Sequence, residues 1–197
     1  MKPAAVVLAG GSGTRLGGVD KGLLRWKGEP FAVHLTRLLA NVGPVALVTQ
    51  TRQTRYAAPL RQAGLAVTVI HDPWDDLGPM AGLVAGLNWA LEQGCDGVVV
   101  APCDAPRLNE KWLSRLLDAA ARSSNRVHVC EVDERLQPLH GWYPVSLAAE
   151  LHAAVSAGER RVARWISAYD PQILPCSDLA EQFLNVNTPA DRDQLES

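Results

Sequence analysis

The amino-acid sequence predicts an α/β fold: a Rossmann-like, mostly parallel sheet with helices on both faces. Short apolar segments alternate along the chain with longer segments of helical periodicity. Most of the apolar segments are continuous, which is typical of strands covered on both faces. A glycine-rich segment directly follows the first of them, as at the carboxyl end of a ligand-binding strand. The predicted strands are Ala4–Ala9, Val45–Thr49, Ala66–Ile70, Gly97–Ala101 and Arg126–Val132.

Three segments place their apolar residues on one helical face, which predicts three helices between the strands. Pro79 suits the first turn of the second helix, where no amide hydrogen is needed, and Asn109 suits the N-cap of the third. Pro144 is likewise expected in the first turn of a later helix. The three apolar faces consist of Phe31, Leu35, Leu38, Leu39 and Val42; of Met80, Leu83, Leu87 and Leu91; and of Trp112, Leu113, Leu116, Leu117 and Ala120.

The alternation changes after about residue 126. The strand Arg126–Val132, the turn Asp133–Arg135 and the run Leu136–Tyr143 predict a hairpin, so this part of the sheet is expected to be antiparallel. No linker, repeat or change of composition divides the chain. A chain of this length buries roughly 70% of its surface on folding. We therefore expect residues 1–197 to form a single domain.

The charge balance argues against several classes of partner. The chain has 19 Lys+Arg against 21 Asp+Glu, a net charge of -2, and so offers no extended cationic surface to nucleic acid or to a membrane. Its first apolar run is too short for a signal or membrane-spanning segment, which favours the cytoplasm. The 4 cysteines and 5 histidines show neither C-x-x-C nor H-x-x-x-H spacing, so no zinc site or disulfide framework is expected.

The segment after Leu8 and Ala9 contains six glycines together with Arg15 and Lys21. Glycine lets backbone N–H groups turn toward an anion, and the two cations can neutralise it, so we interpret the segment as a phosphate-binding loop. A Walker A loop would need lysine directly after its last glycine, and a dinucleotide-binding loop would need Gly or Ala where Leu16 stands. The sequence therefore predicts neither a P-loop ATPase nor a dehydrogenase.

Two acidic residues also follow predicted strands. Asp104 lies between two prolines directly after Gly97–Ala101, a good position for a Mg²⁺ ligand, because Mg²⁺ prefers one or two carboxylates plus phosphate oxygens. The alternative, a helix cap, is better filled by Asn109. Asp72 follows the third strand, where it could contact a nucleoside or simply form an Asx turn.

These motifs occur together in one known family. The chain resembles the molybdenum cofactor guanylyltransferases, the MobA family, over nearly its whole length. The matching segments are Leu8-Ala9-Gly10-Gly11 with Arg15, Gly17-Gly18-Val19-Asp20-Lys21-Gly22, Asp72, Gly78-Pro79-x-Ala81-Gly82, Pro102-Cys103-Asp104-x-Pro106, Gly158-Glu159-Arg160-Arg161 and Asn185-Val186-Asn187-Thr188-Pro189.

The resemblance implies transfer of GMP from GTP to the terminal phosphate of molybdenum-molybdopterin, with release of pyrophosphate and with Mg²⁺ as cofactor. It implies partners in GTP and molybdopterin, and transient contact with molybdoenzymes or other cofactor-biosynthesis proteins. Lys21, Arg15 and Asp104 are then catalytic, with Asp104 on the metal. The implied GTP contacts are Leu8, Ala9, Gly10, Gly11, Lys21, Thr49, Asp72 and Asp104, and the acceptor-site candidates are Arg160, Arg161, Asn185 and Asn187.

Three alternatives remain open at this stage. Sugar-phosphate nucleotidylyltransferases share the first motif, and molybdopterin cytidylyltransferases tend to carry alanine where this chain has Gly10. Gly10 leaves more room for a purine and so favours GTP. The third alternative is an adaptor that binds a guanine nucleotide without turning it over.

Thr49 stands near a position where the family often has asparagine, which makes it a weaker candidate for a nucleoside contact.

Overall fold

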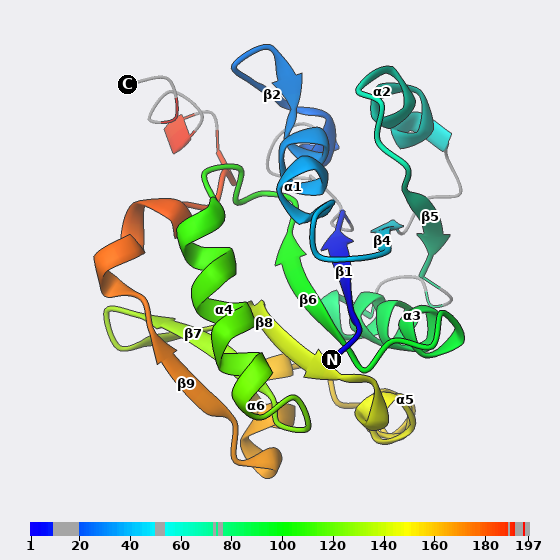
Figure 1. Cartoon of the computed structure of the whole chain (residues 1–197), viewed down its shortest axis with the longest axis vertical. Helices are drawn as coiled ribbons and strands as arrows, with labels where there is room; N and C mark the ends of the chain where they lie inside the picture. The colour runs from blue at the N-terminus through cyan, green and yellow to red at the C-terminus, as the bar shows by residue number, and fades with distance from the viewer. Residues whose placement is uncertain are drawn as a thin grey trace.

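The computed structural model describes residues 1–9, 20–49, 54–72, 74, 77–188, 190–191 and 195. Its main sheet has the order β5-β4-β1-β6-β8-β7-β9 (Figure 1). The strands are β1 (Pro3–Leu8), β4 (Val45–Thr49), β5 (Thr68–His71), β6 (Gly97–Pro102), β7 (His128–Val132), β8 (Arg135–Pro144) and β9 (Gln172–Pro175). The described chain also forms a small hairpin of β2 (Arg25–Trp26) and β3 (Glu29–Pro30).

The sheet is mostly parallel, as predicted. β1 lies between β4 and β6 and pairs in parallel with both, while β5 continues the parallel half beyond β4. β8 pairs antiparallel with β6 and with β7, which confirms the predicted hairpin. β9 then adds to β7 in parallel at the far edge. The carboxyl ends of β1, β4 and β6 therefore meet at one edge, where ligands of such sheets bind.

Helices cover both faces of the sheet. The described helices are α1 (Phe31–Leu39), α2 (Ala57–Gln62), α3 (Pro79–Glu92), α4 (Glu110–Arg122), α5 (Ala148–Ser156) and α6 (Val162–Ile166). Side chains of α1, α2 and α4 pack on one face, in front of the sheet in Figure 1, and those of α3, α5 and α6 pack on the other. In β1, Ala5 and Val7 point to the first face, whereas Ala4 and Val6 point to the second. The continuous apolar run of this strand follows from burial on both sides.

Local signals explain most helix boundaries. Asn109 accepts a hydrogen bond from Lys111 N at 2.9 Å and so caps α4, and Pro79 occupies the first turn of α3; both positions were predicted. The prediction for Pro144 was wrong. Pro144 ends β8 and precedes the 3₁₀ turn η4 (Val145–Leu147), so the α5 helix begins only at Ala148.

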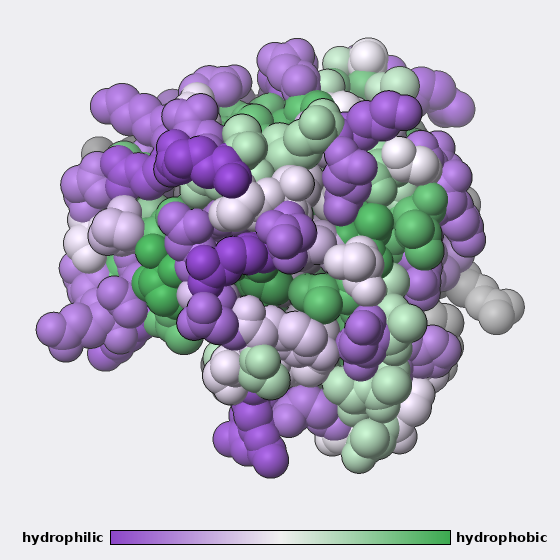
Figure 2. All heavy atoms as spheres, turned by 60° about the horizontal axis from the view of Figure 1, so that its bottom comes forward, coloured by the Kyte–Doolittle hydropathy of each residue, from purple (hydrophilic) through white to green (hydrophobic). Residues whose placement is uncertain are grey.

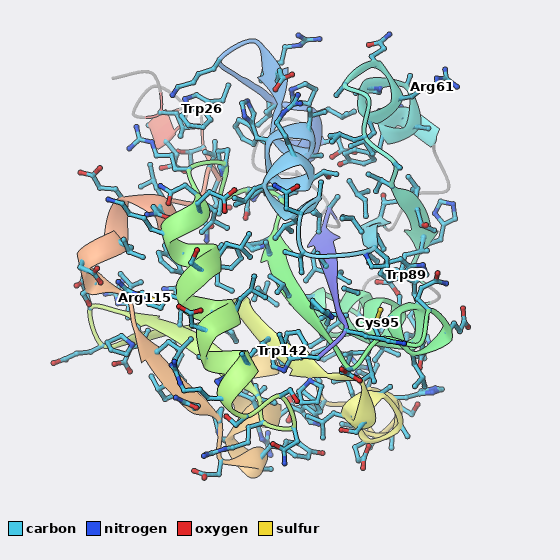
Figure 3. All side chains as sticks on the ribbon, viewed as in Figure 1. Trp26, Arg61, Trp89, Cys95, Arg115 and Trp142 are labelled. Carbon is cyan, nitrogen blue, oxygen red and sulfur yellow. The ribbon has the colours of Figure 1, made fainter. Side chains whose placement is uncertain are left out.

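Long-range contacts hold the antiparallel half against α4. The indole of Trp142, on β8, is fully buried and donates to Ser124 O just beyond α4 at 3.0 Å (Figure 3). Arg115, on α4, makes a bidentate pair with Asp178 at 2.7 Å for both bonds. Asp178 belongs to the 3₁₀ segment η6 (Ser177–Phe183), which leads directly to the motif beginning at Asn185.

Hydrophobic side chains on the surface are few. Met1, Leu91, Leu136 and Ile173 are the exposed large ones in the described chain, and they come from separate elements. The face in Figure 2 accordingly shows hydrophilic side chains interspersed with smaller hydrophobic patches. Scattered exposed residues of this kind are normal for a folded chain.

Candidate active site

A cavity of about 300 Å³ opens where the parallel strands end. Its walls come from the carboxyl ends of β1, β4 and β6, from the start of α3, from β8 and from the segment after η6. The described residues that line it are Leu8, Ala9, Lys21, Val48, Thr49, Asp72, Gly78, Pro79, Gly82, Pro102, Cys103, Asp104, Gln137, Pro138, Leu139, His140 and Asn185. Residues from six of the motifs singled out in the sequence thus share one cavity.

A polar contact joins Lys21 and Asp104, which line the cavity, to Asn187. Lys21 Nζ lies 3.3 Å from Asp104 Oδ2 and also donates to Asn187 Oδ1. The side chains of Lys21 and Asp104 are 21% and 19% exposed, so both remain accessible to a ligand. These three residues are far apart in sequence, and the fold brings them together.

The C-terminal motif is anchored beneath this contact. Val186 N donates to Asp104 O at 2.8 Å, and Asn187 N donates to Asp191 Oδ2 at 2.8 Å. Asn185 lines the cavity, and its Oδ1 is buried without a hydrogen-bond partner among the described residues. A buried acceptor left in this state is poised to accept a ligand's hydrogen bond.

Thr49 and Asp72, the residues predicted to contact a nucleoside, both line the cavity. Both side chains are buried, at 2% and 8% exposure. Asp72 N donates to Thr49 O at 3.1 Å, and Asp72 Oδ1 accepts from Trp74 N at 2.9 Å. Asp72 thus forms the Asx turn that was one interpretation of its sequence position. It also lines the cavity, which the other interpretation, a nucleoside contact, requires.

The end of β1 forms part of the cavity wall, but the backbone amide of Ala9 is not free to bind a ligand. Ala9 N donates to Val48 O at 2.8 Å, and Leu8 O accepts from Cys103 N at 2.9 Å. The Ala9 amide is therefore already used by the sheet. The α3 helix packs closely on this strand at Gly82, where an added Cβ would lie only 3.1 Å from Leu8 Cδ2.

Several predicted site residues either are not described by the structure or do not line the cavity. Gly10, Gly11 and Arg15, together with residues 17–19 and Pro189, lie outside the described residues. Arg160 and Arg161 do not line the cavity. Arg160 Nη1 donates to Val155 O at 2.8 Å and so caps the end of α5. Glu159 accepts the backbone N–H of both arginines and pairs with Arg164 at 3.3 Å, so an acceptor role for the two arginines stays a prediction.

Sequence reasoning missed the wall built by β8. Gln137, Pro138, Leu139 and His140 line the cavity because the β7–β8 register shifts between Val129 and Cys130, which makes this part of β8 bulge. The hydroxyl of Tyr143 donates to Pro138 O and fixes the bulge. Proline within a predicted strand was the available signal, since it breaks a ladder or marks a bulge.

His140 is an unusual member of this wall. Its ring is 2% exposed and packs against Phe183 and Trp112, with centroids 4.9 Å and 6.4 Å away. Neither ring nitrogen has a hydrogen-bond partner among the described residues. Burial lowers the pKa of His140 from its ordinary value of 6.5 to about 3. The ring is therefore neutral in the folded chain near pH 7.

This burial predicts a component of acid sensitivity. Between pH 6.5 and about 3 the unfolded chain binds a proton at this position that the folded chain does not. The His140 contribution to the free energy of unfolding is therefore undiminished above pH 6.5 and declines as the pH falls, by up to ~1.4 kcal/mol per pH unit. Urea titrations at about pH 7, 6 and 5 give the free energy of unfolding at each pH. We expect His140→Phe to reduce the slope of this free energy against pH. His71→Gln, at an exposed histidine, should retain the slope; an unchanged slope in His140→Phe would contradict the assignment.

The donor set of the cavity suits a hard divalent cation. Asp104 supplies a carboxylate, and Asn185 and Asn187 supply amide oxygens nearby. No group of three or more His, Cys, Asp or Glu side chains among the described residues could hold a metal unaided. Such a set fits Mg²⁺, which takes one or two carboxylates and completes its shell with phosphate oxygens and water.

Within the described chain, no helix is both long and apolar enough to cross a membrane.

Comparison with known proteins identifies the family. Residues 5–173 match the family model of the MobA-like NTP transferase domain. The chain is 35% identical over 185 residues to a molybdenum cofactor guanylyltransferase of Pseudomonas fluorescens, covering 93% of this chain and 88% of the relative. It is 34% identical over 197 residues to that of Cereibacter sphaeroides, covering 100% and 97%.

A solved structure agrees in fold. The molybdopterin-guanine dinucleotide biosynthesis protein A of Archaeoglobus fulgidus superimposes with a TM-score of 0.78 at 23% identity, over 98% of this chain and 96% of that one. The sheet order, the cavity at its carboxyl edge and the motifs that meet there accord with these matches. The chain belongs to the MobA-like NTP transferase family.

Proposed function

We propose that this chain transfers GMP from GTP to the terminal phosphate of molybdenum-molybdopterin and releases pyrophosphate. The observation that carries the proposal is the contact of Lys21 with Asp104 and Asn187, which puts an ammonium and a carboxylate at the edge of the sheet where ligands of such folds bind. The choice of guanine and of the pterin acceptor is supported by the names of relatives that are 34–35% identical over nearly the whole chain.

The reaction makes and breaks one bond at the α-phosphorus of GTP. An oxygen of the acceptor phosphate bonds to this atom, and the bond to the bridging oxygen of the β-phosphate breaks, so that pyrophosphate leaves with the electron pair. The attacking phosphate is already anionic and needs no general base. The protein must instead hold two mutually repelling groups in line and neutralise the charge that develops.

The described wall of the cavity supplies too little positive charge for this task. Its charged side chains are Lys21 against Asp72 and Asp104, with His140 neutral, which sums to one negative charge. A triphosphate would be repelled by such a wall unless further cations came with it. Arg15, on the phosphate loop, and Mg²⁺ held by Asp104 are the proposed sources. The metal ion, when bound, would neutralise phosphate charge as a Lewis acid.

The remaining residues take positioning roles in this proposal. Thr49 and Asp72 contact the nucleoside, and the strand end Leu8–Ala9 with the following glycines Gly10 and Gly11 borders the phosphates. Asn185 and Asn187 complete the metal or acceptor site, with the amide of Asn187 also holding Lys21 in place. A cytoplasmic location, transient contact with molybdoenzymes and the absence of nucleic-acid and membrane partners stay predictions.

The test is a screen of nucleotides and acceptors. We expect the purified chain, with Mg²⁺ and molybdenum-molybdopterin, to release pyrophosphate from GTP and to form the guanine dinucleotide detected by mass spectrometry. Discrimination against CTP should be large, on the order of 10²-fold in kcat/KM, because a wrong base leaves buried polar groups unpaired. Equal use of the two nucleotides, or a preference for CTP, would instead assign a cytidylyltransferase.

Two further outcomes separate the remaining alternatives. Pyrophosphate release with a sugar phosphate but not with molybdopterin would assign a sugar-phosphate nucleotidylyltransferase. Tight GTP binding without release from any acceptor would assign a nucleotide-binding adaptor. The presence of both Lys21 and Asp104 favours turnover, because binding alone needs less charge near the reacting phosphorus.

A further inference from the structure

Lys21 is held by its neighbours from behind as well as from the cavity. Asp20 precedes it and caps the 3₁₀ turn η2 (Lys21–Leu23), with Gly22 N donating to Asp20 Oδ1 at 3.2 Å. The same oxygen accepts a hydrogen bond from the hydroxyl of Tyr56. Two donors therefore converge on one oxygen of the Asp20 carboxylate. Lys21 lies in the sequence between Asp20 and one of these donors, Gly22.

Tyr56 comes from a distant part of the chain. It ends the 3₁₀ turn η3 (Thr54–Tyr56), which follows β4, and its side chain is 1% exposed. Burial is the main cause that raises the pKa of Tyr56 well above its ordinary value, with smaller contributions from Cys103 and Asp20. The phenol thus remains protonated, and a buried phenol needs an acceptor. The Asp20 carboxylate is that acceptor.

The tyrosine ring also explains the glycine after Lys21. A Cβ at Gly22 would lie 2.5 Å from Tyr56 Oη and 2.8 Å from Tyr56 Cε1, so the turn rests directly against the ring. Any larger residue would push the turn away from it. The hydroxyl thus holds the Asp20 side chain while the ring supports the backbone of Gly22, and Lys21 lies between these two contacts.

The other end of Lys21 is fixed independently. Its Nζ contacts Asp104 and Asn187, so the ammonium is placed from the cavity side while Tyr56 and Asp20 place the backbone. A long lysine side chain has many rotamers, and fixing both ends reduces the positions that the charge can take. Catalytic groups need this precision, since small misplacements are costly in rate.

We propose that Tyr56 is a positioning residue for nucleotidyl transfer, which acts through Asp20 to present Lys21 to the cavity. The role rests on the proposed function, since it concerns the same reaction. It predicts that the Tyr56 hydroxyl matters to turnover only while Lys21 is present. A residue that merely fills the core would affect the enzyme equally with or without Lys21.

The experiment is a double-mutant cycle on kcat with Tyr56→Phe and Lys21→Ala. We expect Tyr56→Phe to lower kcat by about tenfold in the otherwise unchanged chain and by less than about twofold in the K21A background. The KM for GTP should change far less than kcat. Normal turnover of Tyr56→Phe at saturating substrates, or an equal loss in both backgrounds, would overturn the proposal.

Tyr143→Phe is the matched control. It too removes one hydroxyl from a buried tyrosine, but that hydroxyl donates to the carbonyl oxygen of Pro138, a residue that lines the cavity, and not to Asp20. Whatever its effect on kcat, the effect should be the same with and without Lys21. Thermal unfolding of each variant checks that the fold is retained.

A second readout keeps the test independent of the overall reaction. Acylation of Lys21 by a small amine-reactive reagent, followed by mass spectrometry, needs neither nucleotide nor acceptor. We expect labelling of Lys21 to be about threefold faster in Tyr56→Phe, because the turn is released, and unchanged in Tyr143→Phe. If no substrate is turned over, the proposed function fails while this labelling still decides the role of Tyr56, and equal rates would reject it.

Discussion

Replacing Lys21 with alanine is expected to lower kcat by about two to three orders of magnitude and to weaken GTP binding much less. Lys21 is the one cation among the described residues that line the cavity. Charge on the phosphate oxygens grows as the bond to pyrophosphate breaks, so the ammonium stabilises the transition state more than the bound substrate. The loss should therefore appear in turnover.

Steady-state kinetics at saturating GTP, combined with calorimetric GTP binding, measures the two effects separately. Lys111→Ala provides the control, because Lys111 is an exposed lysine at the start of α4 and does not line the cavity. That variant should behave like the unchanged chain. Near-normal turnover in Lys21→Ala would show that the ammonium has no role in the transfer.

Asp104→Asn should produce the second large effect. Asparagine keeps the shape of the side chain and an oxygen that can accept from Lys21, but it removes the negative charge that would hold Mg²⁺. We expect a loss of about 10²-fold in kcat and a requirement for at least about tenfold more Mg²⁺. The fold should persist, because the main-chain contact of Asp104 O with Val186 N does not depend on the side chain.

Asp72→Asn separates this role from a general loss of charge in the cavity. It makes the same substitution on the other carboxylate, and the asparagine can still accept from Trp74 N. We expect it to raise the KM for GTP while leaving the Mg²⁺ requirement nearly unchanged. A Mg²⁺ titration of the two variants side by side makes the comparison, and an unaltered requirement in Asp104→Asn, or its global unfolding, would move Asp104 to a structural role.

The central strands could be predicted closely because each is buried on both faces. Val45–Thr49 matches the observed β4, whereas β1 differs by one residue at each end and β6 by one residue at its C-terminal end. The edge of the sheet was harder. β5 begins at Thr68 rather than Ala66, and β9 was missed because its apolar run, Ile173 and Leu174, is only two residues long and is followed by proline. α1 also ends at Leu39, before the predicted apolar position Val42.

Some residues of the site could be identified from sequence motifs, whereas others come together only in the folded chain. Lys21, Asp72 and Asp104 follow strand ends or a glycine-rich segment, and local pattern and family resemblance together identified them. Tyr56 sits in no such motif, and its bond to Asp20 spans 36 positions. The bulge of β8 arises from a register shift against β7; Pro138 signals that a bulge is possible, but its position depends on the pairing between the strands.

The contact between Lys21 and Asn187 has a consequence for synthesis on the ribosome. The two residues are 166 positions apart, and the last strand of the sheet ends at Pro175. A nascent chain interrupted after that strand would already contain every described strand, yet Lys21 would lack its amide partner and Asp104 would lack Val186. Such a chain would also lack the buried side chains of Leu179 and Phe183, so the last segment completes the hydrophobic core and the Lys21 contact in the same step of synthesis.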